Sequence, residues 1–184
     1  MGGYTPPRRV RPLANFAGAR RLFFRPKVGL VSFEVLENQA GMLVRGEIQY
    51  QDFIAGIVVN TGELARQITA LAVVDGLIPL PELLQWPNLG FNTGGGYHTV
   101  LPELGRNQRD EFRFATRGTD GVWRLNIDQI RSRVLTPLLQ NGKTYQSHLI
   151  VQEASGGRQF WKFSLSIDDS GKATLVALKK VRQL

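Results

Sequence analysis

The sequence predicts an α+β fold, in which about six to eight mostly antiparallel strands and two helices follow an extended basic N-terminal arm. Three observations lead to this prediction. The first 27 residues are rich in arginine and proline and contain no acidic residue. Several later segments mix apolar and polar residues as strands do, and they are grouped rather than alternating with helices. Two further segments combine a helix-start signal with helical spacing of apolar residues.

The N-terminal arm, residues 1–27, carries most of the net charge of +8. Its cations are Arg8, Arg9, Arg11, Arg20, Arg21, Arg25 and Lys27. Taking these seven from the 23 Lys and Arg of the chain leaves 16, against 15 Asp and Glu, so the remainder is nearly neutral. Proline-rich sequence disfavours helices and interior strands and favours extended chain. We therefore expect a basic arm followed by a single globular domain at 28–184.

The first part of this domain predicts three strands. Residues 28–37 mix β-branched and aromatic residues, and we expect Ala40 and Gly41 to turn the chain. Residues 42–51 alternate polar and apolar side chains, which is typical of an antiparallel hairpin with one wet face. Residues 53–60 indicate a third strand.

The first predicted helix begins at Asn60 and ends near Gly76. Asn60 and Glu63 have the spacing of a capping box, and the apolar residues Leu64, Ile68, Leu71 and Ala72 fall on one helical face. The stretch that follows, as far as Gly105, is interrupted by prolines and by the run Gly94 to Gly96, and it predicts irregular structure.

The second half predicts one strand, one helix and a final meander. Residues 110–118 alternate like a strand with a cationic outer face. Asn126 with Gln129 signals a second helix, whose buried stripe would be Ile127, Ile130, Val134 and Leu138. Residues 144–154, 158–167 and 173–182 indicate three strands, the last two joined by the tight turn 168–171.

The residues offer little chemistry, so we expect neither an enzyme nor a cofactor. The chain has no cysteine and only two histidines, and these lack the spacing of metal ligands. Only His98, beside the glycine run, and His148, in a predicted strand, remain as candidates for a small enzyme. The glycine run itself lacks the Lys-Ser or Lys-Thr of a phosphate-binding loop. No stretch has the roughly 18 apolar residues of a membrane span, so the sequence predicts a soluble protein without a membrane partner.

The seven cations of the arm are the candidate nucleic-acid-binding residues. If all seven contacted one single strand, the logarithm of affinity would fall with the logarithm of salt concentration at a slope of about −5. A basic, proline-rich arm on a neutral, strand-rich body resembles in layout the coat proteins of small icosahedral viruses, and extensions of ribosomal proteins are similar in composition.

This layout implies a non-enzymatic assembly protein, coat-like or nucleocapsid-like, whose arm contacts nucleic acid, neighbouring copies, or both. Its partners would then be nucleic acid, bound without sequence preference, and copies of itself in a homo-oligomer. The alternatives are an RNA-binding or single-strand-binding component of a ribonucleoprotein that forms no shell, and the small enzyme named above. The location would accordingly be a virion or an intracellular ribonucleoprotein.

Overall fold

The structure is a computed structural model that describes residues 25–74, 88–93, 96–98, 100–126 and 138–182. Within these ranges the chain forms twelve strands and no helix, so the predicted α+β fold with two helices is wrong and the described protein is all-β. The strands are β1 (Val28–Val44), β2 (Glu47–Asn60), β3 (Ala65–Val74), β4 (Asn88–Thr93), β5 (Gly96–His98), β6 (Leu101–Leu104), β7 (Arg109–Arg117), β8 (Trp123–Leu125), β9 (Leu138–Leu139), β10 (Lys143–Gln152), β11 (Arg158–Ile167) and β12 (Ala173–Val181).

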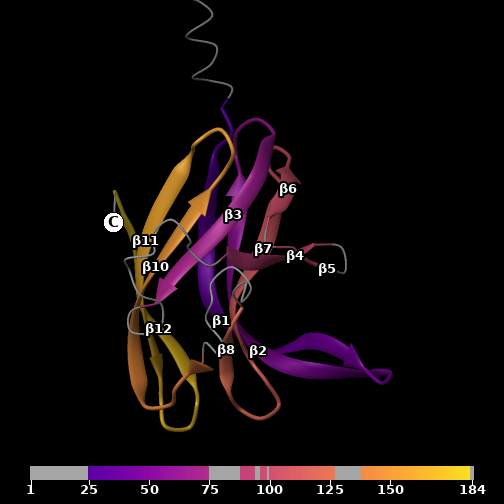
Figure 1. Cartoon of the computed structure of the whole chain (residues 1–184), viewed down its shortest axis with the longest axis vertical. Coiled ribbons are helices and arrows are strands. Elements are labelled where there is room, and N and C mark those ends of the chain that lie inside the picture. Colours follow the sequence, from indigo (N-terminus) through magenta and orange to yellow (C-terminus); the bar gives the residue numbers. More distant parts are fainter. Residues whose placement is uncertain (1–24, 75–87, 94–95, 99, 127–137, 183–184) are drawn as a thin grey trace, which may run out of the picture.

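The strands form two antiparallel layers that share a connected path of hydrogen-bonded neighbours. This path runs β1-β2-β7-β4-β3-β10-β11-β12, and the shorter strands β5, β6, β8 and β9 pair at its sides. In Figure 1 the layer of β10, β11 and β12 lies on one side and the layer of β1, β2 and β7 on the other, with β3 crossing between them. The path therefore ends in two edge strands, β1 and β12.

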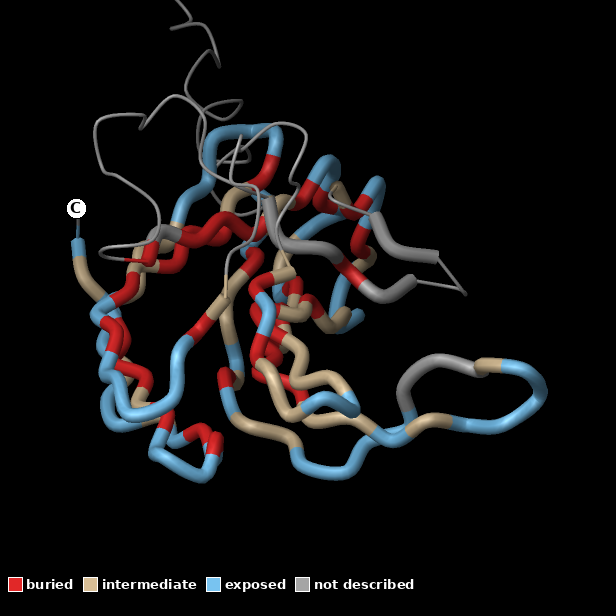
Figure 2. Tube along the Cα trace, turned by 60° about the horizontal axis from the view of Figure 1, so that its bottom comes forward, coloured by how far each residue is buried: buried red, intermediate tan, exposed pale blue. Residues whose placement is uncertain are grey.

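Aromatic side chains fill the space between the layers. Phe33 of β1 meets Phe163 of β11 with ring centroids 4.8 Å apart, and Phe114 of β7 meets the same ring at 5.3 Å. Such edge-on pairs add to the energy gained by burying apolar surface. Figure 2 shows the buried segments gathered where the layers face each other. The core thus joins strands that are far apart in the sequence.

The long hairpin of β1 and β2 turns later than the sequence predicts. Its turn is Arg45–Gly46, and both residues have positive φ, of 50° and 85°, as in the two-residue turns that join antiparallel strands. The expected turn at Ala40–Gly41 is instead a place where the pairing register shifts. The end of this hairpin projects from the sandwich and is largely exposed (Figures 1 and 2).

The first predicted helix is strand β3. Ala65 and Ile68 pair with β6, whereas residues 69–74 pair with β10. Gln67, at this change of partner, has a φ of 50°, which interrupts the alternation of the strand. Ile68, Leu71 and Ala72 of the predicted helical stripe are buried, whereas Leu64 precedes β3 and is 43% exposed. The three buried positions are spaced as on one face of a helix, which explains the wrong prediction.

The second half of the chain agrees better with the sequence. The predicted strand at 110–118 is β7, and the final meander is β10, β11 and β12, with the expected tight turn between the last two. Asp168 closes that turn by accepting hydrogen bonds from the Ser170 hydroxyl and the Lys172 amide. Residues 127–137 of the second predicted helix lie outside the described residues, and its last apolar position, Leu138, begins β9.

Both edge strands carry a β-bulge with an exposed valine. Val31 of β1 and Val176 of β12 fall at register shifts, and each side chain is 63% exposed. Bulges of this kind interrupt the row of free backbone groups along an edge and hinder pairing with another sheet. The bulges therefore hinder the pairing of these two edge strands with strands of other molecules.

Candidate nucleic-acid interface

The last three residues of the predicted arm lie on the body of the sandwich. The backbone N–H of Lys27 donates to Asn60 Oδ1 at 3.0 Å, and the carbonyls of Lys27 and Arg25 accept amides of the turn 61–63 at 3.0 and 3.3 Å. Gly62 permits this contact, because a Cβ at that position would collide with the Arg25 carbonyl oxygen. The body thus holds the backbone of two predicted binding residues, Arg25 and Lys27, whose side chains are exposed.

Asn60 organises this junction. Its Oδ1 also accepts the Gly62 amide at 3.0 Å, and its Nδ2 donates to the carbonyls of Glu63 and Leu104 at 2.5 and 2.8 Å. The bond to the amide two residues later is that of an Asx-turn. Asn60 therefore caps a turn at the end of β2 rather than the predicted helix.

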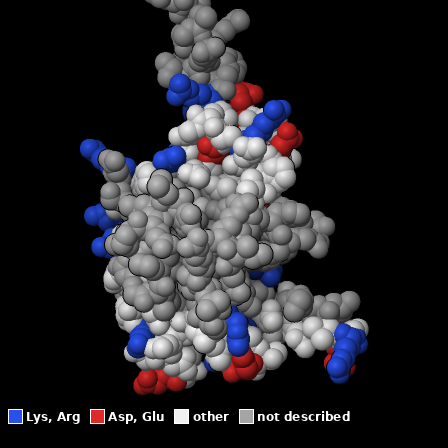
Figure 3. Space-filling view, viewed as in Figure 1, with Lys and Arg blue, Asp and Glu red and all other residues white. Residues whose placement is uncertain are grey.

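The other five predicted binding residues, Arg8, Arg9, Arg11, Arg20 and Arg21, lie outside the described residues. On the face seen in Figure 3, several cations of the described part lie beside an acidic residue, whereas those along the left edge have no acid beside them. The charges of the body are thus mixed over most of this face.

Three of the four arginines of β7 and β8 are neutralised by acids of the body. The ion pairs are Arg113–Glu111 at 3.3 Å, Arg117–Asp52 at 3.5 Å and Arg124–Asp120 at 2.6 Å. Hydrogen bonds from the Arg124 side chain and from the Val122 amide lower the pKa of Asp120 to about 2. This strip is therefore better explained as a solvated sheet face than as an anion-binding surface.

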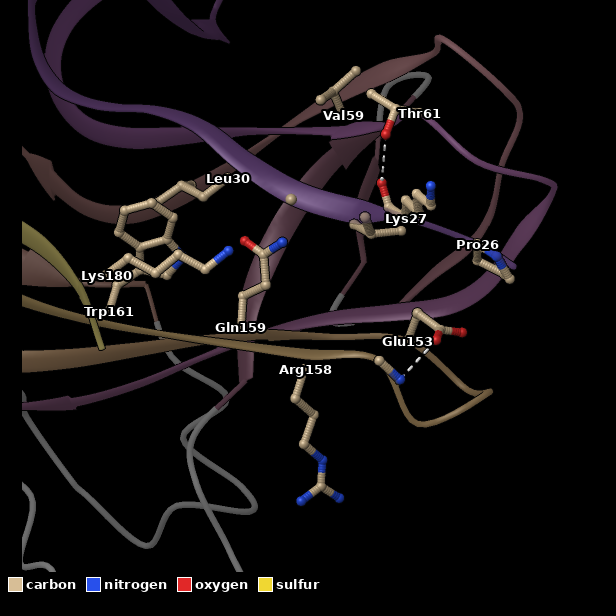
Figure 4. Close-up of a pocket in the computed structure, with 13 residues that line it drawn as sticks. Pro26, Lys27, Leu30, Val59, Thr61, Glu153, Arg158, Gln159, Trp161 and Lys180 are labelled. Carbon is tan, nitrogen blue, oxygen red and sulfur yellow. Dashed lines mark hydrogen bonds between the residues drawn. The ribbon is translucent and has the colours of Figure 1, made fainter. Parts of the chain in front are cut away.

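A cleft of about 510 Å³ lies beside the anchored residues Pro26 and Lys27. We call it the edge cleft, because its walls come from β1 on one side and from β11 and β12 on the other (Figure 4). Leu30 and Trp161 line it and also pack against the hydrophobic core. The edge cleft thus has an apolar floor between the two ends of the strand path.

Three cationic residues line the edge cleft, and we call them the cationic rim: Lys27, Arg158 and Lys180, of which Arg158 points its side chain away from β1 (Figure 4). They come from positions far apart in the sequence. Among the described residues none of the three takes part in an ion pair. Lys180 Nζ lies 5.7 Å from the centre of the Trp161 ring, within the range of a cation–π attraction.

Glu153 is the carboxylate among the residues that line the cleft. Its oxygens accept hydrogen bonds from the Ser155 hydroxyl and from the amides of Ser155 and Gly157, at 2.5 to 2.8 Å. Burial by itself would raise the pKa of Glu153, but these hydrogen bonds outweigh it and lower the pKa. Glu153 is therefore charged at neutral pH, and its oxygens are occupied by hydrogen bonds within its own turn. The three cations outnumber this single carboxylate, so the net charge of the residues that line the cleft is positive.

The two lysines near the C-terminus, Lys179 and Lys180, point to opposite faces of β12. Lys180 belongs to the edge cleft, whereas Lys179 pairs across β12 and β11 with Lys162. Like charges directly opposite each other are unfavourable in a sheet. Lys162 and Lys179 therefore add positive potential on the outer side of the same strands.

The two histidines lie on different strands. His98 ends β5 and pairs with Phe91, and His148 is in β10 opposite Lys162. Ser147 and His148 point to opposite faces of β10, because successive strand residues alternate, so they do not form a Ser-His pair. Within the described residues no group of three or more His, Asp or Glu side chains is arranged to hold a metal ion. The same part of the chain has no helix suited to crossing a membrane.

Sequence reasoning missed two residues of this site, Arg158 and Trp161. Their signal was present, because "RQFWK" at 158–162 interleaves basic and aromatic residues as single-strand-binding surfaces do. The sequence predicts an ordinary strand at 158–167. Nothing near this segment in the chain indicates that it will lie close to the arm.

The comparisons with known proteins give no similar protein for this chain. The chain matches no protein-family model, and neither the curated proteins nor the solved structures give a significant match.

Proposed function

We propose that this protein is a non-enzymatic structural protein that binds nucleic acid through its basic arm and the cationic rim. One observation carries the proposal: the backbone of residues 25–27 is hydrogen-bonded to the body beside the edge cleft. Lys27 therefore lines the same cleft as Arg158 and Lys180. The arm and rim together contain nine cations.

The mechanism is neutralisation of phosphates by the cations of the arm and the rim. Because each neutralised phosphate releases a counterion, nine contacts to a single strand predict a slope of about −6 in log affinity against log salt concentration. Such binding reads no base sequence, because lysine and arginine contact the backbone.

The salt dependence of binding tests this proposal. Changing Arg8, Arg9, Arg11, Arg20 and Arg21 to glutamine leaves four of the nine cations, so the slope should become about −3. The measurement is fluorescence anisotropy with a labelled single-stranded oligonucleotide at several salt concentrations.

A matched control removes cations elsewhere. Lys143 and Lys172 lie at the far end of β10 and β11 from Arg158, since Lys143 pairs with Ile167. Lys143→Gln with Lys172→Gln should leave the slope near that of the original chain. Full-chain binding with no salt dependence, or an unchanged slope in the five-residue variant, would contradict the proposal.

We also propose that copies of the protein assemble through the projecting β1–β2 hairpin. Ile48 and Tyr50 are 55% and 59% exposed and share one face of β2, where the register places Ala40 opposite Tyr50. Isolated two-stranded hairpins are only marginally stable in water, so a covering partner would stabilise this one. Near the tip Arg45 and Glu47 carry opposite charges, which allows two hairpins to approach about a two-fold axis without net repulsion.

Assembly can be tested by sedimentation and electron microscopy of the full chain with and without nucleic acid. We expect oligomers or shells, and we expect Ile48→Ser with Tyr50→Ser to lower the sedimentation coefficient to that of a monomer while circular dichroism is unchanged. Since both side chains are already exposed, the change should not unfold the body. A full chain that stays monomeric under both conditions would support the ribonucleoprotein component that forms no shell.

A further inference from the structure

Trp161 has a feature that the phosphate-binding proposal does not use. It is on the inner face of β11, and its indole Nε1 is buried without a hydrogen-bond partner among the described residues. A buried N–H without an acceptor is unfavourable, and such groups are uncommon in native proteins. Trp161 lines the edge cleft, but its Nε1 has almost no accessible surface, so an acceptor on a bound molecule reaches it only after neighbouring side chains move.

Gln159 is the second residue of the edge cleft whose polar side-chain group has no hydrogen-bond partner among the described residues. It lies two positions from Trp161 on the same face of β11, and its side chain points toward β1, whereas Arg158 points away (Figure 4). Its amide lies about 3.0 Å from where a Cβ of Gly29 would be, so a side chain at that position would require the amide to shift. Its side chain makes no hydrogen bond to another described residue. An amide has donors and an acceptor and therefore matches the edge of a heterocyclic base.

The floor and rim of the edge cleft favour one class of ligand. The floor offers an aromatic ring and Leu30, which suit a flat, apolar group. A phosphate attached to such a flat group would be attracted by Lys180, which lies above the Trp161 ring, and by Lys27 at the rim. The volume of about 510 Å³ lies in the usual range for small-molecule sites. An acidic peptide would use the cations, but its charged side chains would leave the aromatic floor without a flat apolar group.

We propose that the edge cleft binds one unpaired nucleotide, with the base against Trp161 and Gln159 and the phosphate on Lys180 and Lys27. As a site for a nucleotide within a strand, this inference rests on the proposed function. It adds that the bound nucleic acid is single-stranded, because the base edges of a duplex are already paired. A free nucleotide has the same chemistry, and the experiment separates the two sources.

The test compares four ligands at one salt concentration: an oligothymidylate, an abasic oligomer with the same number of phosphates, a duplex of equal length, and thymidine monophosphate. The full chain should prefer oligothymidylate over the abasic oligomer by about tenfold or more, since stacking on one aromatic side chain contributes that much. Trp161→Ala should abolish this preference and leave the salt slope unchanged.

Phe160→Ala is the matched control, because Phe160 is the neighbouring aromatic residue on the opposite face of β11 and should not affect the preference. Trp161→Phe keeps the ring and removes the N–H, so it should retain part of the preference. If Trp161→Ala does not fold, the indole ¹H–¹⁵N signal of Trp161 in the full chain still tests the contact, because it should shift when thymidine monophosphate is added.

The outcomes distinguish this inference from the proposed function. Equal affinity for oligothymidylate and the abasic oligomer, with the steep salt slope kept and no shift of the Trp161 signal, would overturn the cleft site and leave the phosphate-binding function intact. Binding of thymidine monophosphate that depends on Trp161, without binding of either oligomer, would establish a free-nucleotide site and overturn the proposed function. No preference, no salt slope and no indole shift would overturn both.

Discussion

Changing Asn60 to alanine should destabilise the sandwich by about 3 kcal/mol or more and release the backbone of residues 25–27. The side chain is fully buried and makes four hydrogen bonds to backbone groups. Alanine would leave Lys27 N–H and the Leu104 carbonyl without this partner, and each buried group left unsatisfied costs about 1 to 3 kcal/mol. Urea unfolding followed by circular dichroism measures the loss.

Thr61→Ala is the matched control, because its hydroxyl is exposed and reaches the Lys27 carbonyl only at 3.5 Å. It should change the free energy of unfolding by about 0.5 kcal/mol or less. Truncation gives a second comparison: a chain that begins at Arg25 should keep the stability of the full chain, whereas one that begins at Val28 should lose part of it. If Asn60→Ala were as mild as Thr61→Ala, the junction would not contribute to folding.

Changing Trp123 to alanine should lower the free energy of unfolding by about 3 to 5 kcal/mol. Trp123 of β8 is only 1% exposed and belongs to the central core, so its removal would leave a large cavity. Its indole Nε1 also donates to the Gly171 carbonyl at 2.8 Å. This bond ties the turn between β11 and β12 to the opposite layer.

Trp123→Phe separates the two contributions, since it keeps most of the buried ring and removes only the hydrogen bond. We expect it to cost about 1 to 3 kcal/mol, the penalty for leaving the Gly171 carbonyl unsatisfied. Arg124→Gln, at the exposed neighbouring position, should have a much smaller effect. Equal losses in the phenylalanine and alanine variants would show that packing of the ring contributes little, contrary to the burial seen here.

The errors of the fold prediction have a common origin in irregular strands. Asn60 supplies the same side-chain bond to a following amide in an Asx-turn as at a helix start, so the residues cannot tell whether a helix or a strand follows. Gln67 then adopts a left-handed conformation and shifts the buried positions of β3 out of alternation. The strand β10, whose pairing with β3 and β11 has no register shift, was predicted correctly, because a period of two is a local signal.

The candidate site was predictable only at its N-terminal side. The arm cations stand out in the sequence because they form one run without acids. Arg158 and Trp161 do not, because nothing near them in the sequence indicates that β11 will lie across from β1. The same limitation applies to Arg117 of β7, whose acidic partner Asp52 comes from β2.

The sequence by itself therefore determined the separation of charge between arm and body, the regular strands and the tight turn at 168–171, since all of these depend on residues close together in the chain. The tertiary structure alone decided that β1 and β12 end the path of strands and that Lys27, Arg158 and Lys180 line one cleft with Trp161. The physical reason is that strand order and layer packing follow from long-range hydrogen bonding and burial, which no local pattern of residues specifies.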